Sequence, residues 1–96
     1  MSDPRTITVR NDETAGCYEA IVDDHRSVAE YTIEGGRMIL THTFVPPELR
    51  GFGVAEKLVR AALADARAKG LKVVPDCSYV AKFIERHAEF HDLRAS

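Results

Sequence analysis

The residues best suited to bind a ligand form one short turn, Arg50-Gly51-Phe52-Gly53-Val54-Ala55, directly before a helical pattern. The first N–H groups of a helix have no partner within the helix, and the helix dipole adds partial positive charge there. Gly51 and Gly53 allow close approach to the backbone, and Arg50 offers a guanidinium to phosphate oxygens. The turn therefore favours phosphate binding, although a glycine-bearing loop before an ordinary helix has the same pattern. It completes neither a P-loop nor a dinucleotide fingerprint.

Two other residues, Cys77 and His42, could take part in nucleophilic or proton-transfer chemistry. Cys77 stands at or just before an expected helix start, where the pKa of a thiol falls and the reactive thiolate is favoured. A nearby imidazole has the same effect, and His42 becomes that partner if the predicted strands over residues 38–45 and 71–74 are neighbours. The ordinary pKa of histidine also suits a general base. The alternatives are an inert Cys77 packed at a strand end and a solvent-facing or structural His42.

Several remaining polar residues are weaker candidates for a binding or metal-ligating role. Asp76 could bind a cationic acceptor. His87 and His91 are four apart, as in a helical metal pair, but no third ligand follows at a sensible spacing, so we expect no metal. The basic residues along the long helical segment form a solvated face, from which Lys57 or Arg60 could reach phosphates.

The first half of the chain is predicted to form strands. Alternating and β-branched residues predict four strands joined by tight turns, over residues 6–9, 17–22, 28–33 and 38–45. Gly35-Gly36 is a hairpin signal, and Pro46-Pro47 ends the fourth strand. Short connections of this kind indicate an antiparallel meander.

The second half of the chain has a different period. Apolar residues recur at helical spacing from Gly53 to Lys69, and Gly70 is a plausible C-terminal cap. A fifth strand follows over residues 71–74, and Ser78 could cap a last helix that runs to about Arg86 or His87, with an irregular tail after it. The sequence therefore predicts an α+β fold in the order ββββ-α-β-α, with the fifth strand parallel to the fourth and joined to it by a right-handed crossover.

Bulk properties exclude several classes of protein. The 96 residues predict one domain over residues 1–96. A net charge of -2 lacks the basic excess of a nucleic-acid binder. No apolar run is long enough to span a membrane, and residues 1–5 lack the apolar core of a signal peptide. We therefore expect a cytoplasmic protein in which Cys17 and Cys77 are free thiols, and the oligomeric state stays open.

Three short motifs, in order along the chain, resemble one known family. Arg50-x-x-Gly53-x-Ala55 matches the Arg/Gln-x-x-Gly-x-Gly/Ala motif of the GCN5-related N-acetyltransferases. His42-Thr43-Phe44-Val45-Pro46 precedes it and Pro75-Asp76-Cys77 follows it, as in a subfamily of short predicted acetyltransferases. The resemblance covers more than half of the chain, from Thr41 to about Leu93. It implies a minimal version of that family's fold and acetyl-coenzyme A (acetyl-CoA) as the ligand.

The resemblance also implies roles for individual residues. Backbone amides from about Gly51 to Ala55 would hold the coenzyme pyrophosphate. The pantetheine arm would enter a gap between the separating ends of the fourth and fifth strands. Its thioester would lie near His42 and Cys77, and Cys77 could accept the acyl group. The implied coenzyme-binding residues are Val45, Arg50, Gly51, Phe52, Gly53, Val54, Ala55 and Lys57.

Tyr79 is a third catalytic candidate that rests on the resemblance. Many family members use a tyrosine in the helix after the fifth strand as the general acid toward the leaving thiolate. Tyr79 stands very early in that helix, so packing or a plain surface hydroxyl is the alternative.

The expected function is that of an acetyl-CoA-dependent N-acyltransferase, with an amine acceptor such as a protein lysine or N-terminus. Longer family members carry helices between the first two strands and further strands after the last helix, and these form much of the acceptor site. Here only residues 11–16 separate the first two strands, and nothing strand-like follows His87. Two alternatives therefore stay open, a non-catalytic acetyl-CoA-binding module and a structural or interaction domain without ligand.

Overall fold

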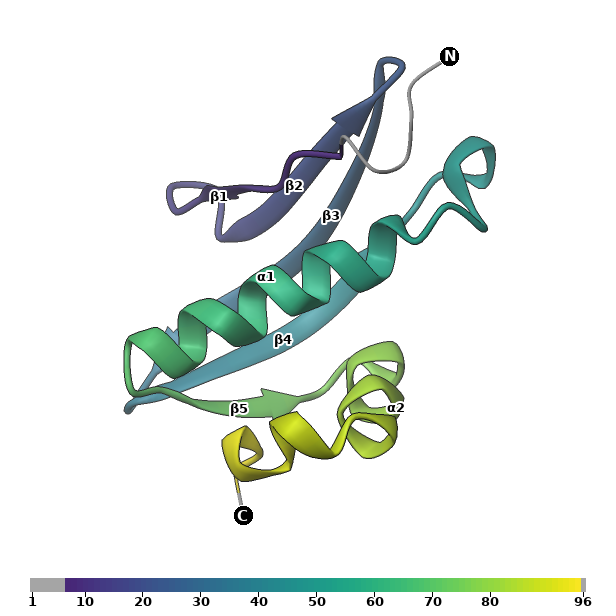
Figure 1. The fold of residues 1–96 in the computed structure, drawn as a ribbon. Coiled ribbons are helices and arrows are strands. Elements are labelled where there is room, and N and C mark those ends of the chain that lie inside the picture. The colour runs from purple at the N-terminus through teal and green to yellow at the C-terminus, as the bar shows by residue number, and fades with distance from the viewer. Residues whose placement is uncertain (1–6, 96) are drawn as a thin grey trace.

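The computed structural model describes residues 7–95, which form a mixed sheet, two α-helices and two short 3₁₀-helices (Figure 1). The elements in order are β1 (Arg10–Asp12), β2 (Cys17–Val22), β3 (His25–Glu34), β4 (Arg37–Phe44), η2 (Pro47–Leu49), α1 (Val54–Ala68), β5 (Lys72–Pro75), α2 (Ser78–Arg86) and η3 (Ala88–Leu93). The strands lie in sequence order in one sheet; β1 to β4 are antiparallel neighbours, and β5 is parallel to β4. The predicted α+β order ββββ-α-β-α is confirmed.

Local backbone rules explain the two tight hairpins. Gly35 and Gly36 both have positive φ, at 57° and 75°, as the β3–β4 turn requires. Asp23 and Asp24 make the β2–β3 turn with φ of 50° and 65°, a conformation that aspartate tolerates better than most residues.

The first strand differs from its prediction. Residue 6 lies outside the described part of the chain, and residues 7–9 are not strand; β1 instead covers Arg10–Asp12. The reason is the turn that follows it. The N–H of Gly16 donates to the Asp12 carbonyl over 2.9 Å, and the N–H of Ala15 donates to Asp12 Oδ1 over 3.1 Å. This closed turn places Asp12 opposite Cys17, so the pairing begins there.

The tail also differs from its prediction, because it is not irregular. After η3, Arg94 forms a parallel bridge with Val73, and the N–H of Ala95 donates to the Val73 carbonyl over 2.8 Å. The tail thus covers the outer edge of β5, whose backbone groups would otherwise have no partner in the sheet.

The core lies between α1 and one face of the sheet (Figure 1). The apolar stripe of α1 is buried, and its members are Val54, Leu58, Val59, Ala62, Leu63 and Ala66. Tyr18 of β2 is buried under the helix and donates its hydroxyl to Asp65 over 2.8 Å. α2 and η3 lie beside β5 and bury Phe83, Ile84 and Leu93.

Two features of β4 shape the region beyond the core. Glu30 pairs with His42 and Tyr31 pairs with Leu40, so Thr41 is an extra residue that makes a β-bulge. β5 pairs with β4 only as far as Leu40, whose carbonyl also accepts the Cys77 N–H over 3.0 Å. β4 continues to Phe44 while the chain turns from Cys77 into α2. The two strands therefore separate at their C-terminal ends, where the resemblance places a gap.

Candidate functional site

The start of α1 is an open helix N-terminus. Gly53 is its N-cap, in the left-handed region with φ 77°, and Gly51 before it has φ 90°. The first intrahelical bond runs from the Lys57 N–H to the Gly53 carbonyl over 3.2 Å. The N–H groups of the three preceding helical residues, 54–56, therefore have no acceptor within the helix, and glycine supplies no capping side chain.

Gly51 and Gly53 are required by their backbone conformation and not by crowding around them. A Cβ built on Gly51 or Gly53 meets no heavy atom within 4 Å. The space beside the amides is therefore open to a ligand. Residues other than glycine adopt this conformation only with strain, so the turn depends on glycine at both positions.

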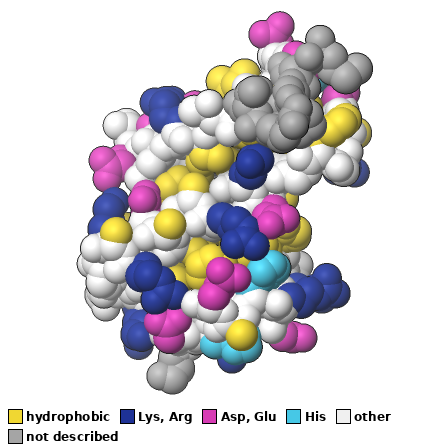
Figure 2. Space-filling view, viewed as in Figure 1, with side chains coloured by type: hydrophobic (Ala, Val, Ile, Leu, Met, Phe, Trp, Pro, Cys, Tyr) yellow, Lys and Arg dark blue, Asp and Glu magenta, His cyan; other side chains and the backbone are white. Residues whose placement is uncertain are grey.

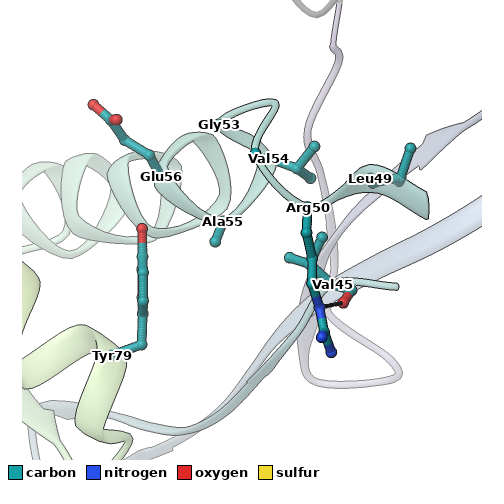
Figure 3. A pocket seen from close by; sticks show the side chains of 9 residues that line it. Val45, Leu49, Arg50, Gly53, Val54, Ala55, Glu56 and Tyr79 are labelled. Carbon is teal, nitrogen blue, oxygen red and sulfur yellow. Dashed lines mark hydrogen bonds between the residues drawn. The ribbon is translucent and has the colours of Figure 1, made fainter. Parts of the chain in front are cut away.

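A cavity of about 260 Å³ lies against this turn (Figure 3). It is lined by Val45, Leu49, Arg50, Gly51, Gly53, Val54, Ala55, Glu56 and Tyr79. A second hollow of about 250 Å³ continues it toward the end of β4, with Thr43 and Phe44 added to its lining. The two share Val45, Arg50, Ala55 and Tyr79. Together they form one groove, here called the turn groove.

Arg50 ties the end of β4 to the glycine turn. Its Nε donates to the Val45 carbonyl over 3.2 Å. Figure 3 shows the guanidinium beside Val45 and directed away from Gly53. The arginine of the motif therefore holds the turn against the end of β4.

Tyr79 lines both hollows of the turn groove and is 40% exposed. Its ring extends from α2 toward the first turn of α1, with the hydroxyl at the α1 end (Figure 3). Burial, and then the negative charge of Glu56, raise the pKa of Tyr79 above its ordinary value. The hydroxyl is therefore protonated at neutral pH, and the raised pKa makes it a weaker acid than an ordinary tyrosine.

Cys77 is half-buried and is the N-cap of α2, a position the sequence had given to Ser78. Its thiol donates to Thr43 Oγ1 over 3.5 Å. Burial raises the pKa of Cys77. The Thr43 hydroxyl can turn to donate to the thiolate once it forms, and this bond, with the N–H groups of Val80 and Tyr79, outweighs burial and lowers the pKa. The Cys77 side chain makes no capping hydrogen bond to these N–H groups. They act on the thiol as the positive end of the α2 dipole.

The structure does not bring His42 and Cys77 together. Thr41 and His42 lie opposite Glu30 at the bulge, and the next residue, Thr43, is the one that contacts Cys77. Because consecutive strand residues face opposite sides of the sheet, the exposed His42 faces away from Cys77. Sequence reasoning missed Thr43, which lies in the same five-residue motif, because the bulge decides which of the two residues faces the groove.

The other candidates lie outside the turn groove. Phe52 and Lys57 are exposed and line neither hollow, and Asp76 is exposed after β5. His87 Nδ1 lies 2.7 Å from the Phe83 carbonyl, and His91 Nε2 lies 3.1 Å from the Glu85 carbonyl. Within residues 7–95, no three His, Cys, Asp or Glu side chains gather as a metal site would require.

Charges of both signs are interspersed on the face that α1 presents, as Figure 2 shows. No helix in the described residues is long and apolar enough to cross a membrane.

Comparison with known proteins agrees with the fold. A family model of GCN5-related N-acetyltransferases matches residues 17–93. Protein NATD1 of Bos taurus and that of Homo sapiens are each 34% identical over 84 residues, which is 86% of this chain and 66% of theirs. The solution structure of a GCN5-like protein from Staphylococcus aureus superposes with a TM-score of 0.75 at 24% identity, covering 100% of this chain and 92% of that one.

The chain belongs to the GCN5-related N-acetyltransferase family. It spans just under two thirds of the length of the bovine NATD1 protein.

Proposed function

We propose that this chain binds acetyl-CoA in the turn groove and transfers the acetyl group to an amine. The observation that carries the proposal is the uncapped, glycine-opened start of α1 at the wall of a groove that leads to the end of β4. The coenzyme pyrophosphate suits this position, because the amides of residues 54–56 and the helix dipole both favour an anion.

The rest of the groove suits the pantetheine arm, which is neutral and rich in amides. Thr43, Phe44 and Val45 line the groove where β4 has lost β5 as a neighbour. Backbone groups of an unpaired strand can bond to the arm's amides, as in strand addition. This path brings the thioester toward Tyr79 and Thr43, next to Cys77.

Two routes of transfer fit the side chains at that end. In direct transfer, the neutral amine attacks the thioester carbonyl, the C–S bond breaks, and Tyr79 protonates the leaving CoA thiolate. The amine nitrogen releases one proton to solvent, from which Tyr79 is reprotonated. In the second route, the Cys77 thiolate attacks first, forming an acyl-Cys77 thioester and releasing CoA, and the amine then attacks that thioester. The lowered pKa of Cys77 supports the second route. His42, on the opposite face, keeps a role as base only toward an acceptor that enters from there.

Intact-protein mass spectrometry after incubation with acetyl-CoA, beside calorimetric titration, tests the proposal. A single acetyl adduct that hydroxylamine removes, and that Cys77→Ala prevents, supports the route through Cys77. Cys17→Ala is the matched control, because Cys17 is buried and donates nothing to the groove. Binding without an adduct, with turnover of an amine that Tyr79→Phe slows, supports direct transfer. Absence of binding refutes the proposal and leaves a structural or interaction domain.

A non-catalytic acetyl-CoA-binding module is the second candidate, favoured by the openness of the acceptor side. Residues 13–16 connect β1 and β2 as a bare turn, so no helix covers the sheet at that point. Tight binding with no transfer to peptide amines, in wild type and Cys77→Ala alike, supports the module. The cytoplasmic location and a protein as acceptor stay predictions of the sequence.

A further inference from the structure

The sheet has a second face, turned away from α1 and called the outer face here; in Figure 1 it is the side behind the helix. Tyr18 marks the covered face, because its hydroxyl is bonded to a residue of α1. Its neighbour Cys17 therefore faces outward. Cys17 pairs with Glu30 of β3, and Glu30 pairs with His42 of β4, so these three residues form one row across the outer face. Glu30 and His42 are both exposed there.

The arginines of the outer face already have acidic partners. Glu19, which is 8% exposed, accepts from Arg10 Nη2 over 2.7 Å and from Arg26 Nε. Arg10 Nη2 also lies 3.4 Å from Asp12 Oδ2. The two positive charges are therefore matched by the two carboxylates beside them, and neither is left for Glu30.

Glu30 is an acid without such a match. Its side chain forms no ion pair or hydrogen bond with any of residues 7–95. Its backbone carbonyl accepts from the Thr41 hydroxyl over 3.4 Å, which links the bulge of β4 to β3 at this point. Paired residues of neighbouring strands have Cβ atoms about 5 Å apart. An ammonium group between Glu30 and His42 would therefore meet a carboxylate and an imidazole that can take its proton.

The Glu30–His42 pair lies directly behind the end of the turn groove. β5 pairs with β4 only as far as Leu40, so His42 belongs to the part of β4 that has lost β5 as a neighbour. The next residue, Thr43, contacts Cys77 over 3.5 Å from the opposite side of β4. The proposed function brings the thioester next to Cys77. The pair and the acyl group are thus separated by the thickness of one strand, beyond the last rung of the β4–β5 pairing.

We propose that the acceptor is a cationic amine, such as a lysine side chain, which reaches the acyl group from the outer face with its ammonium group held by Glu30. The inference rests on the proposed function, to which it adds the class of the acceptor and its side of entry. His42 takes one proton from the bound ammonium group and passes it to solvent, and the neutral amine then attacks the thioester in either route of transfer. A base is needed, because fewer than about one lysine side chain in a thousand is neutral at neutral pH.

Steady-state acetyl transfer by the full chain to two amines that differ in charge tests the proposal. Nα-acetyl-lysine amide is protonated at neutral pH, whereas methoxyamine is neutral. Rates are corrected for the uncatalysed reaction of each amine with acetyl-CoA. Glu30→Gln should raise the KM for the lysine amide roughly tenfold with little change in kcat, because it removes a charge-assisted contact. Both constants for methoxyamine should stay unchanged.

The matched control is Glu34→Gln. Glu34 is an exposed acid on the same strand and face as Glu30, four residues along and therefore about 13 Å away. Its substitution should change neither constant for either amine. His42→Gln should lower kcat for the lysine amide by roughly 100-fold and affect methoxyamine far less, because methoxyamine arrives already neutral.

Each other outcome counts against the inference. Transfer to methoxyamine but not to the lysine amide, or equal effects of Glu30→Gln on both amines, including none, overturns the cationic acceptor. A rise in KM with Asp76→Asn and none with Glu30→Gln places the cation at the end of β5 and overturns the outer-face entry. Binding of acetyl-CoA without transfer to either amine overturns the transfer step of the proposed function and this inference together, and leaves the binding module. Unchanged circular dichroism and thermal melting of Glu30→Gln separate loss of the contact from loss of the fold.

Discussion

The two ends of α1 differ in whether their unpaired backbone groups find hydrogen-bond partners. Every helix leaves unpaired N–H groups at its start and unpaired carbonyls at its end. At the end of α1, Gly70 with φ 69° closes a Schellman motif, in which the N–H groups of Leu71 and Gly70 donate to Ala66 and Arg67 over 2.8 and 3.2 Å. At the start, Gly53 leaves the amides of residues 54–56 without such partners.

The residues around the two ends of α1 differ in the same way. Near the closed end, Asp65 accepts from the buried Tyr18, and Arg67 forms a salt bridge with Asp92 over 2.8 Å that anchors η3. Near the open end lie the turn groove, Tyr79 and the lowered-pKa thiol of Cys77. The closed end is built for stability, and the open end keeps its polar groups available for a ligand. Four predictions test this contrast, in order of decreasing expected effect.

Gly53→Glu should abolish the function of the open end. The new side chain is strained at φ 77°, covers the amides and adds a negative charge where an anion should bind. We expect acetyl-CoA affinity to fall by roughly 100-fold or more in calorimetric titration. Gly53→Ala, which carries the strain without the charge or the bulk, should lose clearly less. Equal losses in the two variants would mean that backbone strain, and not the anion site, explains the effect.

Alkylation should distinguish the two cysteines by roughly tenfold or more in rate near neutral pH. Cys77 is half-buried with a lowered pKa, whereas Cys17 is 3% exposed and accepts from Arg26 in the sheet over 3.4 Å. Because the pKa of Cys77 is lowered, its thiolate and its alkylation rate should appear at lower pH than for an ordinary thiol. Peptide mapping after timed iodoacetamide treatment measures both rates. Acetyl-CoA should protect Cys77, and faster reaction of Cys17 would contradict the contrast.

Gly70→Ala should destabilise the closed end by about 1 kcal/mol, because alanine is strained at positive φ. Denaturant unfolding measures the change. Acetyl-CoA affinity should be unaffected, since the substitution lies at the opposite end of the helix from the turn groove. Lys69→Ala, at an exposed neighbour with φ −94°, is the control and should leave the unfolding midpoint nearly unchanged.

Arg67→Ala should have the smallest effect, a loss of about 0.5 kcal/mol, because its bonds to Asp92 and to the Glu89 carbonyl are exposed. Hydrogen exchange should rise at Ala95, whose N–H is bonded to Val73, before any change in α1. If global stability and exchange throughout the core change as well, η3 is part of the core and not an anchored cover.

Interactions between near neighbours in the chain could be predicted from the sequence. The α1 stripe, the Gly35-Gly36 hairpin, the Gly70 cap and the glycine turn each depend on residues a few positions apart, and the structure confirms them. The parallel placement of β5 followed from the helix that separates it from β4.

The amino-acid sequence alone therefore predicts the order of elements, the family and the position of the open helix start. Three features follow from the folded arrangement instead: Thr43 and not His42 meets Cys77, β1 begins at Arg10, and Arg94 bridges to Val73. The physical reason is register: a bulge at Thr41 or a closed turn at Asp12 changes which residues face each other across strands, and neither leaves a periodic signal in the chain. The hollow between Glu56 of α1 and the side chains of Tyr79, Phe83 and His87 is of the same kind, because it exists only where α1 and α2 meet.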